Sequence, residues 1–284
     1  MNEKNALQRL DKTAVRRAFD RLAPAYLSTA QVQSEICQRM LSRLELVRLT
    51  PSVILDAGAG PGVAARSMAA RYPQATTIAL DLSCGMLLQI PRPSKWARWL
   101  GGSKDFPVRA LCADFECVPL ASASVDCVVS NLALAWSEDP QRCLSELHRI
   151  LKPGGLLMFS TLGPDTLMEW GDKRGLAFTQ RLVDMHDLGD LLSHQGYAGP
   201  VMDQEHLRLT YSHASKLLAD LKHWGGLDLT MDRPRGLGGR KRLEAITWGE
   251  ATLEVVYGHA WKPETVAAHR LKDGRSVIHF ASKT

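Results

Sequence analysis

The sequence predicts an α/β fold of the doubly wound type, in which helices cover both faces of a mostly parallel sheet. The first observation is a series of short apolar runs, at residues 53–55, 77–80, 108–111, 125–129 and 156–159. Runs that are nearly all apolar are typical of strands buried on both faces. The second observation is that helical segments separate these runs, as parallel strands joined by crossover helices require.

Two helices are expected ahead of the first strand. Apolar side chains recur at helical spacing between residues 12 and 49, and Pro24 interrupts this pattern. We therefore expect the two helices to separate at Pro24. Together they would form an N-terminal helical lid over residues 1–49.

The helices between the strands have recognisable ends. One runs from Val63 to about Tyr72 and stops at Pro73. Another spans residues 141–151, and the Lys-Pro-Gly-Gly segment at 152–155 ends it and leads into the fifth strand. Residues 50–161 are thus expected to form the core of the sheet.

Beyond residue 161 the pattern weakens. The elements expected there are a helix at 187–194, a strand at 200–211, a helix at 215–223, and a final pair of strands near 253–257 and 277–281. Residues 225–250 are rich in glycine and arginine, which favours a loop or lid. We expect one domain over 1–284, whose second half, 162–284, carries a lid insertion at about 212–250.

Bulk composition is that of an ordinary globular protein. The 284 residues are 45% hydrophobic and 23% charged, and no apolar run is long enough to cross a bilayer. The first residues lack the pattern of a secretory signal, so we expect a cytoplasmic protein without a membrane partner. The net charge of +5 comes from scattered residues, which argues against nucleic acid and suits an acidic protein partner.

Six cysteines lie mostly within apolar segments, and no two of them have the C-x-x-C spacing of a zinc or redox site. We therefore expect all six to be reduced core thiols.

The strongest motif lies at residues 53–62, where an apolar strand ends in Asp56 and the turn after it contains Gly58 and Gly60. Glycine permits a tight turn at positive φ and lets a ligand approach the backbone closely. The motif indicates a nucleotide-like cofactor at this edge of the sheet. A glycine-rich connection without a ligand is the alternative.

The spacing of the motif bears on the kind of cofactor. Val63 occupies the position where a dinucleotide fingerprint has its third glycine, which a diphosphate requires. Asp81 ends the second strand about twenty residues further on, where a carboxylate can accept hydrogen bonds from a ribose diol. An adenosine without a diphosphate satisfies both observations.

Further polar residues follow the third and fourth strands: Asp114 and Phe115 after one, Asn131 after the other. Carboxyl ends of parallel strands meet at one edge, so these residues are expected to share a site with the glycine turn.

Four segments in this order resemble the class I S-adenosylmethionine methyltransferases: residues 55–62, 80–83, 113–114 and 151–155. The resemblance implies a Rossmann-like sheet of seven strands and S-adenosyl-L-methionine as the cofactor. It implies that Asp81 holds the ribose, Asp114 the adenine amino group, Phe115 and Met86 the adenine faces, and Gly58 and Gly60 the methionine portion. Asp56, Leu82 and Asn131 complete the expected cofactor site. Core packing is the alternative role for Met86 and Phe115.

The flanking segments are similar to those of the malonyl-acyl carrier protein O-methyltransferases: residues 15–26, 131–136, 159–167, 184–190 and 257–261. The similarity covers nearly the whole chain. Ala59 stands where that family often has cysteine, and Cys84 where it often has proline. The resemblance implies methylation of the free carboxylate of malonyl-acyl carrier protein, or of malonyl-CoA, in biotin synthesis.

Such a reaction needs no strong base, because an ordinary carboxylate is already ionised at neutral pH. Tyr26 is the candidate catalytic residue, since a phenol can hydrogen-bond to the carboxylate without neutralising it. Its alternative role is to pack the lid. Similarly, the basic residues between Arg233 and Arg242 suit an acidic carrier protein or belong to a solvated loop.

Other interpretations remain open at this point. Asp184, His186 and Asp187 are expected to begin a helix rather than bind a metal, because aspartate is a favoured helix cap. The fold would also suit an arginine hydroxylase, a cofactor-binding assembly factor without catalysis, or a methyltransferase for a small molecule such as a quinone.

Overall fold

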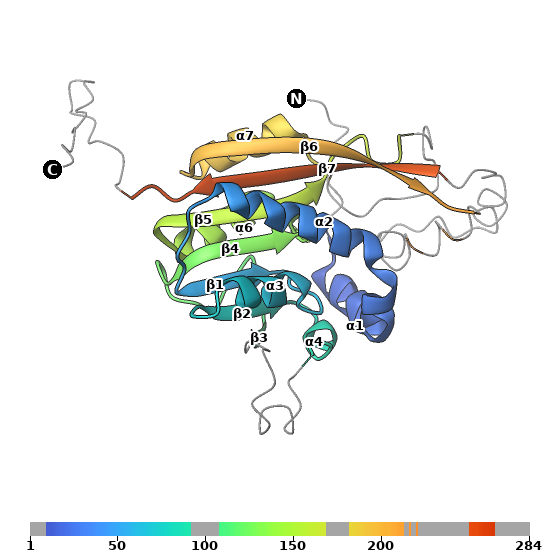
Figure 1. Cartoon of the computed structure of the whole chain (residues 1–284), viewed down its shortest axis with the longest axis horizontal. Helices are drawn as coiled ribbons and strands as arrows, with labels where there is room; N and C mark the ends of the chain where they lie inside the picture. Colours follow the sequence, from blue (N-terminus) through green and yellow to red (C-terminus); the bar gives the residue numbers. More distant parts are fainter. Residues whose placement is uncertain are drawn as a thin grey trace.

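Figure 1 shows the computed structural model as three layers, with helices on both faces of a central sheet. The structure describes residues 10–91, 108–168, 182–212, 216, 220 and 250–264. Within them, one sheet contains seven strands: β1 (Val53–Ala57), β2 (Thr76–Asp81), β3 (Val108–Cys112), β4 (Val125–Asn131), β5 (Leu151–Leu162), β6 (Ala198–Thr210) and β7 (Glu250–Trp261). Their spatial order is β3-β2-β1-β4-β5-β7-β6.

The first five strands are parallel, and β7 runs antiparallel to both of its neighbours, β5 and β6. The expected doubly wound, mostly parallel fold is therefore confirmed. Of the expected final pair of strands, the one near 253–257 is confirmed as β7, and its two neighbours in the sheet are β5 and β6. Several of the expected segments lie outside the described residues. They are the strand at 277–281, the stretch 225–249, and the helix at 215–223 except for Lys216 and Asp220.

Helices cover the two faces of the sheet. They are α1 (Lys12–Thr29), α2 (Gln31–Ser42), α3 (Val63–Arg71), α4 (Cys84–Leu87), α6 (Pro140–Ile150) and α7 (Met185–His194), with short 3₁₀ turns η2 (Arg43–Leu46) and η3 (Leu134–Trp136). One hydrophobic cluster joins α2 and α3 to the sheet, and a second joins α6 and α7 to its other face. Ile54 belongs to the first cluster and its neighbour Leu55 to the second, as the period-two alternation of a strand requires.

Helix α1 does not end at Pro24, contrary to the sequence-based expectation. It continues to Thr29, and the break falls at Ala30, which has non-helical backbone angles and donates its N–H to the carbonyl of Tyr26. Proline removes one backbone hydrogen bond from a helix. Burial of Ala23, only 2% exposed, and of Ala18 keeps this helix seated on the protein despite that loss.

The cysteines also differ from expectation. Cys84 and Cys112 form a disulfide, and Cys117 is exposed, so only Cys37, Cys127 and Cys143 are buried thiols. Pairing of β2 with β3 places Cys112 beside Asp81, three residues before Cys84. Spacing along the chain does not show this proximity, because the two cysteines are 28 residues apart.

The start of α7 confirms the expected cap. Asp184 accepts a hydrogen bond from the backbone N–H of His186, and the helix begins at Met185.

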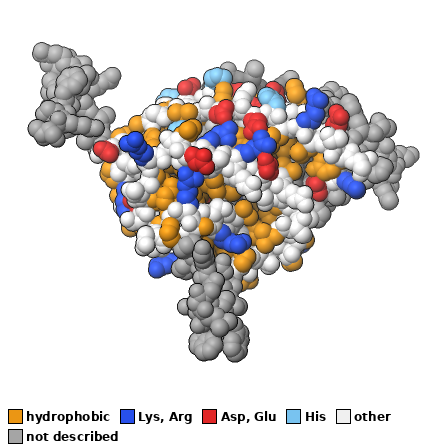
Figure 2. Space-filling view, viewed as in Figure 1, with side chains coloured by type: hydrophobic (Ala, Val, Ile, Leu, Met, Phe, Trp, Pro, Cys, Tyr) orange, Lys and Arg blue, Asp and Glu red, His pale blue; other side chains and the backbone are white. Residues whose placement is uncertain are grey.

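On the face shown in Figure 2, basic and acidic side chains are interspersed. Among the described residues, no helix combines the length and the apolar character that a membrane crossing requires.

Candidate active site

A cavity opens at the carboxyl ends of β1, β2 and β4. The connections from β1 and β4 lead to opposite sides of the sheet, and such a reversal leaves a crevice between the two strands. The cavity contains about 1000 Å³ of free space, part of it open to solvent. Its lining includes all the predicted site residues except Asp56: Tyr26, Gly58, Gly60, Asp81, Leu82, Met86, Asp114, Phe115 and Asn131.

Asp56 lines a smaller neighbouring cavity of about 420 Å³. Tyr26, Gly58, Gly60 and Asn131 line both cavities, so the two spaces adjoin at the glycine turn. The structure thus gathers every predicted site residue around one region.

The glycine turn needs its glycines for two different reasons. Gly58 has a φ of +77°, and a Cβ there would lie 2.2 Å from the Cβ of Ala133. Gly60 has a φ of +53°, and a Cβ there would meet nothing within 4 Å. Close packing therefore adds to the backbone strain at Gly58, whereas at Gly60 only the backbone conformation favours glycine.

Asp81 is held by two backbone donors. Its Oδ2 accepts from the N–H of Gly60 at 2.7 Å, and its Oδ1 from the N–H of Ser83 at 2.7 Å. Burial raises the pKa of Asp81 to about 6, against the effect of these two hydrogen bonds, and the charge of Asp20 adds to the rise. At neutral pH the carboxylate remains mainly ionised, and each oxygen keeps a lone pair for a ligand.

Asp56 is more deeply buried, with only 1% of its surface exposed. Its Oδ2 accepts from the N–H of Ala65 in α3 at 2.8 Å, whereas its Oδ1 has no hydrogen-bond partner among the described residues. Burial is the main reason that the pKa of Asp56 is raised to about 7. A donor group entering the smaller cavity would favour the ionised form.

Asp114 is engaged by the N-terminal helix. Its Oδ2 lies 2.5 Å from the ammonium of Lys12, and Glu116, which is 4% exposed, lies 2.9 Å from the same ammonium. Burial alone would lower the pKa of Lys12, but its hydrogen bonds to Asp114 and Glu116 raise it. This contact fixes the start of α1 beside the motif expected to bind adenine.

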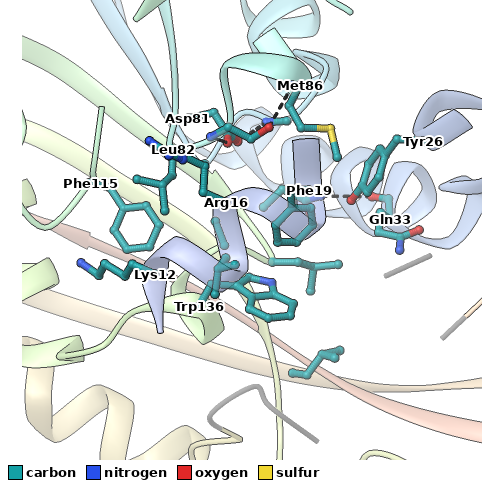
Figure 3. Close-up of a pocket in the computed structure, with 18 of the residues that line it drawn as sticks. Lys12, Arg16, Phe19, Tyr26, Gln33, Asp81, Leu82, Met86, Phe115 and Trp136 are labelled. Carbon is teal, nitrogen blue, oxygen red and sulfur yellow. Dashed lines mark hydrogen bonds between the residues drawn. The ribbon is translucent and has the colours of Figure 1, made fainter. Parts of the chain in front are cut away.

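Figure 3 shows the aromatic side chains that line the cavity: Phe19, Tyr26, Phe115 and Trp136. Phe19 packs edge-on against Trp136, with ring centroids 5.2 Å apart, and against Tyr26 at 6.5 Å. Burial, with a contribution from the charge of Asp81, raises the pKa of Tyr26. Its phenol therefore stays protonated at neutral pH and can donate a hydrogen bond.

Comparison with known proteins identifies the family. Residues 55–159 match the model of the methyltransferase domain. The chain is 45% identical to the malonyl-[acyl-carrier protein] O-methyltransferase of Gallionella capsiferriformans, over 96% of this chain and 98% of that protein. It is 43% identical to the Methylovorus protein of the same name, over 95% of each. The chain belongs to the malonyl-[acyl-carrier protein] O-methyltransferase family.

Solved structures confirm the fold of this family member as that of a class I methyltransferase. An S-adenosylmethionine-dependent methyltransferase of Thermotoga maritima superposes with a TM-score of 0.53 at 17% identity, over 87% of this chain and 99% of that one. S-adenosyl-L-methionine, the cofactor expected from the sequence motifs, is confirmed by the family and domain matches. Family membership does not favour the hydroxylase or assembly-factor interpretations.

The residues of this methyltransferase fit that cofactor. Two buried acceptors, Asp56 Oδ1 and Gln33 Oε1, line the smaller cavity without a hydrogen-bond partner among the described residues. Buried acceptors are costly when unpaired, so the space suits a group rich in N–H donors, such as the ammonium of a methionine moiety. Asp81, nearby at the end of β2, suits a ribose diol.

Sequence reasoning missed several residues of the cavity: Lys12, Arg16, Phe19, Gln33 and Trp136. A signal existed for those on α1, because Lys12, Arg16, Phe19 and Tyr26 follow helical spacing and share one face. Gln33 also carried a signal, as a polar residue on the apolar face of α2 that contains Ile36, Cys37 and Met40.

Proposed function

We propose that this protein transfers the methyl group of S-adenosyl-L-methionine to the free carboxylate of malonyl-acyl carrier protein in the cytoplasm. The product, a malonyl methyl ester, would prime pimeloyl synthesis for biotin. The observation that carries the proposal is 45% identity, over nearly the whole chain, to a relative named for this reaction. Whether malonyl-CoA also serves is decided by the experiment below.

The cofactor would lie along the glycine turn. When bound, it supplies a methyl group made electrophilic by a sulfonium charge. Asp81 would accept hydrogen bonds from the ribose hydroxyls, with Leu82 beside it, and Phe115 and Met86 would pack against the adenine. Asp114 would take the adenine amino group through the lone pairs that its bonds to Lys12 and to the Glu116 backbone leave free.

The methionine end would occupy the smaller cavity. Asp56 Oδ1 and Gln33 Oε1 would supply the acceptors for its ammonium. Gly58 and Gly60 would let the amino-acid part of the cofactor approach the backbone of the turn. Asn131 would hold neighbouring elements in place. Its side-chain amide donates to the backbone carbonyl of Gln33 at 3.1 Å, while its Oδ1 accepts from the hydroxyl of Ser160. This network joins α2 to β4 and β5 at the border of the two cavities.

Tyr26 is the residue that we assign to the acceptor. Its protonated phenol would donate a hydrogen bond to the malonyl carboxylate and orient one oxygen toward the methyl group. The larger cavity is also lined by the uncharged donors Gln33, Ser83, Asn131 and Trp136, but Ser83 already donates to Asp20 and Asn131 to the backbone carbonyl of Gln33. Orientation rather than proton removal is the task, because the carboxylate is ionised already.

Helix α1 would act as the lid over the acceptor. It contributes Lys12, Arg16, Phe19 and Tyr26 to the cavity, and Phe19 and Trp136 form an apolar cover that would strip water from the carboxylate. Removing water strengthens the attraction between an anion and the sulfonium charge.

Mass spectrometry of the purified full-length protein tests the proposal. With S-adenosyl-L-methionine and malonyl-acyl carrier protein, the carrier should gain one methyl group, whereas acetyl-acyl carrier protein should gain none. A parallel reaction with malonyl-CoA measures the need for the carrier protein. No methyl gain by protein shown to bind the cofactor would overturn the proposal.

A Tyr26→Phe variant tests the role of the phenol. Loss of one hydrogen bond to a charged group costs ~2 kcal/mol, so kcat/KM for the malonyl substrate should fall about thirtyfold. The Kd for S-adenosylhomocysteine, measured by calorimetry, should change less than twofold. Tyr72→Phe, at the C-terminal end of α3 and outside both cavities, is the matched control and should retain the wild-type rate.

A further inference from the structure

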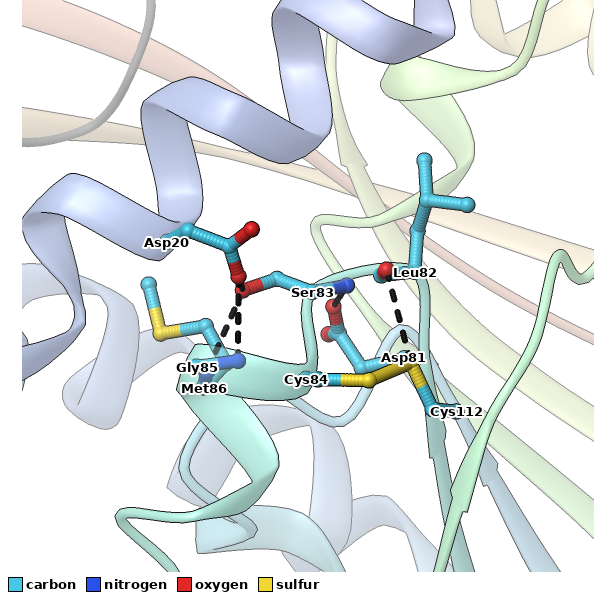
Figure 4. Close-up of a disulfide and its surroundings, with 8 residues drawn as sticks. All are labelled: Asp20, Asp81, Leu82, Ser83, Cys84, Gly85, Met86 and Cys112. Atoms are coloured by element: carbon cyan, nitrogen blue, oxygen red, sulfur yellow. Dashed lines mark hydrogen bonds between the residues drawn. A yellow bond between two sulfur atoms is a disulfide. The ribbon is translucent and has the colours of Figure 1, made fainter.

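The disulfide joins two segments that meet at the cofactor site (Figure 4). Cys84 is the first residue of α4, and Cys112 is the last residue of β3. Their Cα atoms are 5.5 Å apart, and both residues are exposed. Small thiols and disulfides in solution can therefore reach the pair.

One of these segments carries the residues proposed for the ribose and adenine. Ser83, directly before Cys84, donates its N–H to Asp81, and its hydroxyl accepts from the N–H of Met86. The Ser83 hydroxyl also donates to Asp20 of α1 at 2.6 Å. A change at Cys84 therefore acts on the turn that holds both Asp81 and Met86.

The other segment leads to the far side of the adenosine site. Cys112 pairs with Asp81 in the sheet register, and its sulfur lies 3.7 Å from the carbonyl oxygen of Leu82. Two residues later comes Asp114, bound to Lys12, and then Phe115 in the cavity wall. The disulfide thus cross-links the start of α4, which follows β2, to the end of β3, and the adenosine would lie between these two segments.

We propose that Cys84 and Cys112 are a reversible dithiol–disulfide site whose oxidation tightens binding of the cofactor. The oxidant is a small-molecule disulfide of the glutathione class. A thiolate of one cysteine attacks it and releases one small thiol, and the second cysteine then displaces the other. The protein loses two electrons and two protons, and the oxidant is reduced to two thiols.

The direction follows from the ordering of the site. A cross-link between these two segments reduces the number of conformations open to the free protein, so less conformational freedom is lost when the cofactor binds. We expect the oxidised protein to bind about fivefold more tightly, at the low end of the usual range of coupling between sites. Because the coupling is reciprocal, bound ligand should stabilise the disulfide by the same factor.

The remaining cysteines provide internal controls. Burial raises the pKa of Cys37 and of Cys127 to about 12, which keeps both as unreactive thiols. Cys117 is exposed but forms no disulfide, so it reports modification by glutathione that is unrelated to the pair.

The experiment uses the full-length protein equilibrated in buffers of reduced and oxidised glutathione. Mass spectrometry after alkylation should find a Cys84–Cys112 cross-linked peptide, and calorimetry should give an S-adenosylhomocysteine Kd about fivefold lower for the oxidised form. With saturating S-adenosylhomocysteine, the midpoint of reduction should shift by about −20 mV, the fivefold factor converted for a two-electron couple. Absence of the cross-link, or equal Kd values in both forms, would overturn the proposal.

Variants separate the pair from general oxidation. The double variant Cys84→Ser, Cys112→Ser should bind with the affinity of the reduced protein in every buffer, whereas Cys117→Ser should respond as the wild type does. If the double variant does not fold, the comparison of reduced and oxidised wild type still decides the question. The inference uses only the cofactor site of the proposed function, and its binding assay requires no methyl transfer, so each can fail without the other.

Discussion

The glycine-turn region and the N-terminal helix differ in how their polar contacts are made. Around the turn, Asp56 binds Ala65 and Asp81 binds Ser83 and Gly60, partners only 2 to 21 residues away in the chain. Helix α1 instead reaches the site through Lys12 with Asp114 and Asp20 with Ser83, which are 102 and 63 residues apart. The turn is therefore built by its own strands, whereas α1 depends on a few distant contacts.

This difference indicates that the two regions bind different ligands. A cofactor shared by many reactions is bound by a preformed edge of the sheet, and the acceptor is bound under a helix whose contacts can be changed separately. Substitutions at the turn should therefore affect cofactor binding or folding, and those on α1 should affect the acceptor or the closure of the lid.

Removal of the Asp81 carboxylate should have the largest effect. Asp81→Ala loses two hydrogen bonds to a charged group, a cost of ~3 kcal/mol, so the Kd for S-adenosylhomocysteine should rise about 100-fold. Calorimetry measures the Kd, and Asp190→Ala, at an exposed position of α7 away from both cavities, is the control. A rise of less than threefold for Asp81→Ala would show that the ribose lies elsewhere.

Two glycines separate crowding from backbone strain. Gly58→Ala adds a contact of 2.2 Å with Ala133 to a positive φ, and should lower the free energy of unfolding by ~2–4 kcal/mol. Gly199→Ala has a similar φ of +56° and open space around the new methyl, so only ~1–2 kcal/mol is expected. Denaturant unfolding measures both. Equal losses would mean that the Gly58 region shifts to accommodate the methyl group.

Loss of the Lys12 ammonium should loosen the lid. Lys12→Met leaves Glu116 without this cation, which should destabilise the closed position of α1 by ~1–2 kcal/mol and speed chymotrypsin cleavage at Phe19 and Tyr26 by roughly tenfold. Arg17→Met, exposed on the same helix, is the control. Unchanged cleavage would indicate that α1 is held by its apolar face alone.

The same ion pair has a defined pH dependence. The pKa of Lys12 is raised above 10.5 in the folded protein, so its contribution to stability is complete below that value and is lost as pH rises through the folded pKa. Through loss of the Lys12 charge, cleavage of α1 in the wild type should therefore accelerate in strongly alkaline buffer.

The smallest expected effect is the response of the turn to acid. The pKa of Asp81 is about 6, so a fall from pH 7.5 to 5.5 should weaken S-adenosylhomocysteine binding about fourfold through this residue alone. Asp56 has a pKa of about 7 and would titrate over the same range, so the measurement is repeated in Asp56→Asn, where only the titration of Asp81 remains. Affinity that is constant in that variant would place the pKa of Asp81 below this range.

The stability of the ligand-free protein should change with pH in the opposite direction to its affinity for the ligand. Because burial raises the pKa values of Asp56 and Asp81 above the usual 3.8, the folded state binds more protons than the unfolded state between about pH 4 and 7. This contribution to the free energy of unfolding therefore decreases as pH rises through that window.

Much of the molecule was predictable from local patterns. Buried strands give nearly continuous apolar runs, and the runs near residues 53–55 and 156–159 became β1 and β5. The candidate site was predictable as a set because carboxyl ends of parallel strands meet at one edge. The end of α1 was not, since Pro24 removes only one hydrogen bond and tertiary burial of Ala23 offsets that loss.

The sequence by itself determined the parallel sheet, the glycine turn and the motifs at the edge of the sheet where the cofactor binds. The spacing of apolar residues, the steric limits of the backbone and the short connections between elements all act over a few residues. Only the tertiary structure decided that Lys12 meets Asp114, that Gln33 borders the Asp56 cavity, and that Cys84 joins Cys112. These contacts depend on where a helix lies across the sheet and which strands pair. The free energy that sets both is spread over the whole core rather than contained in any short segment.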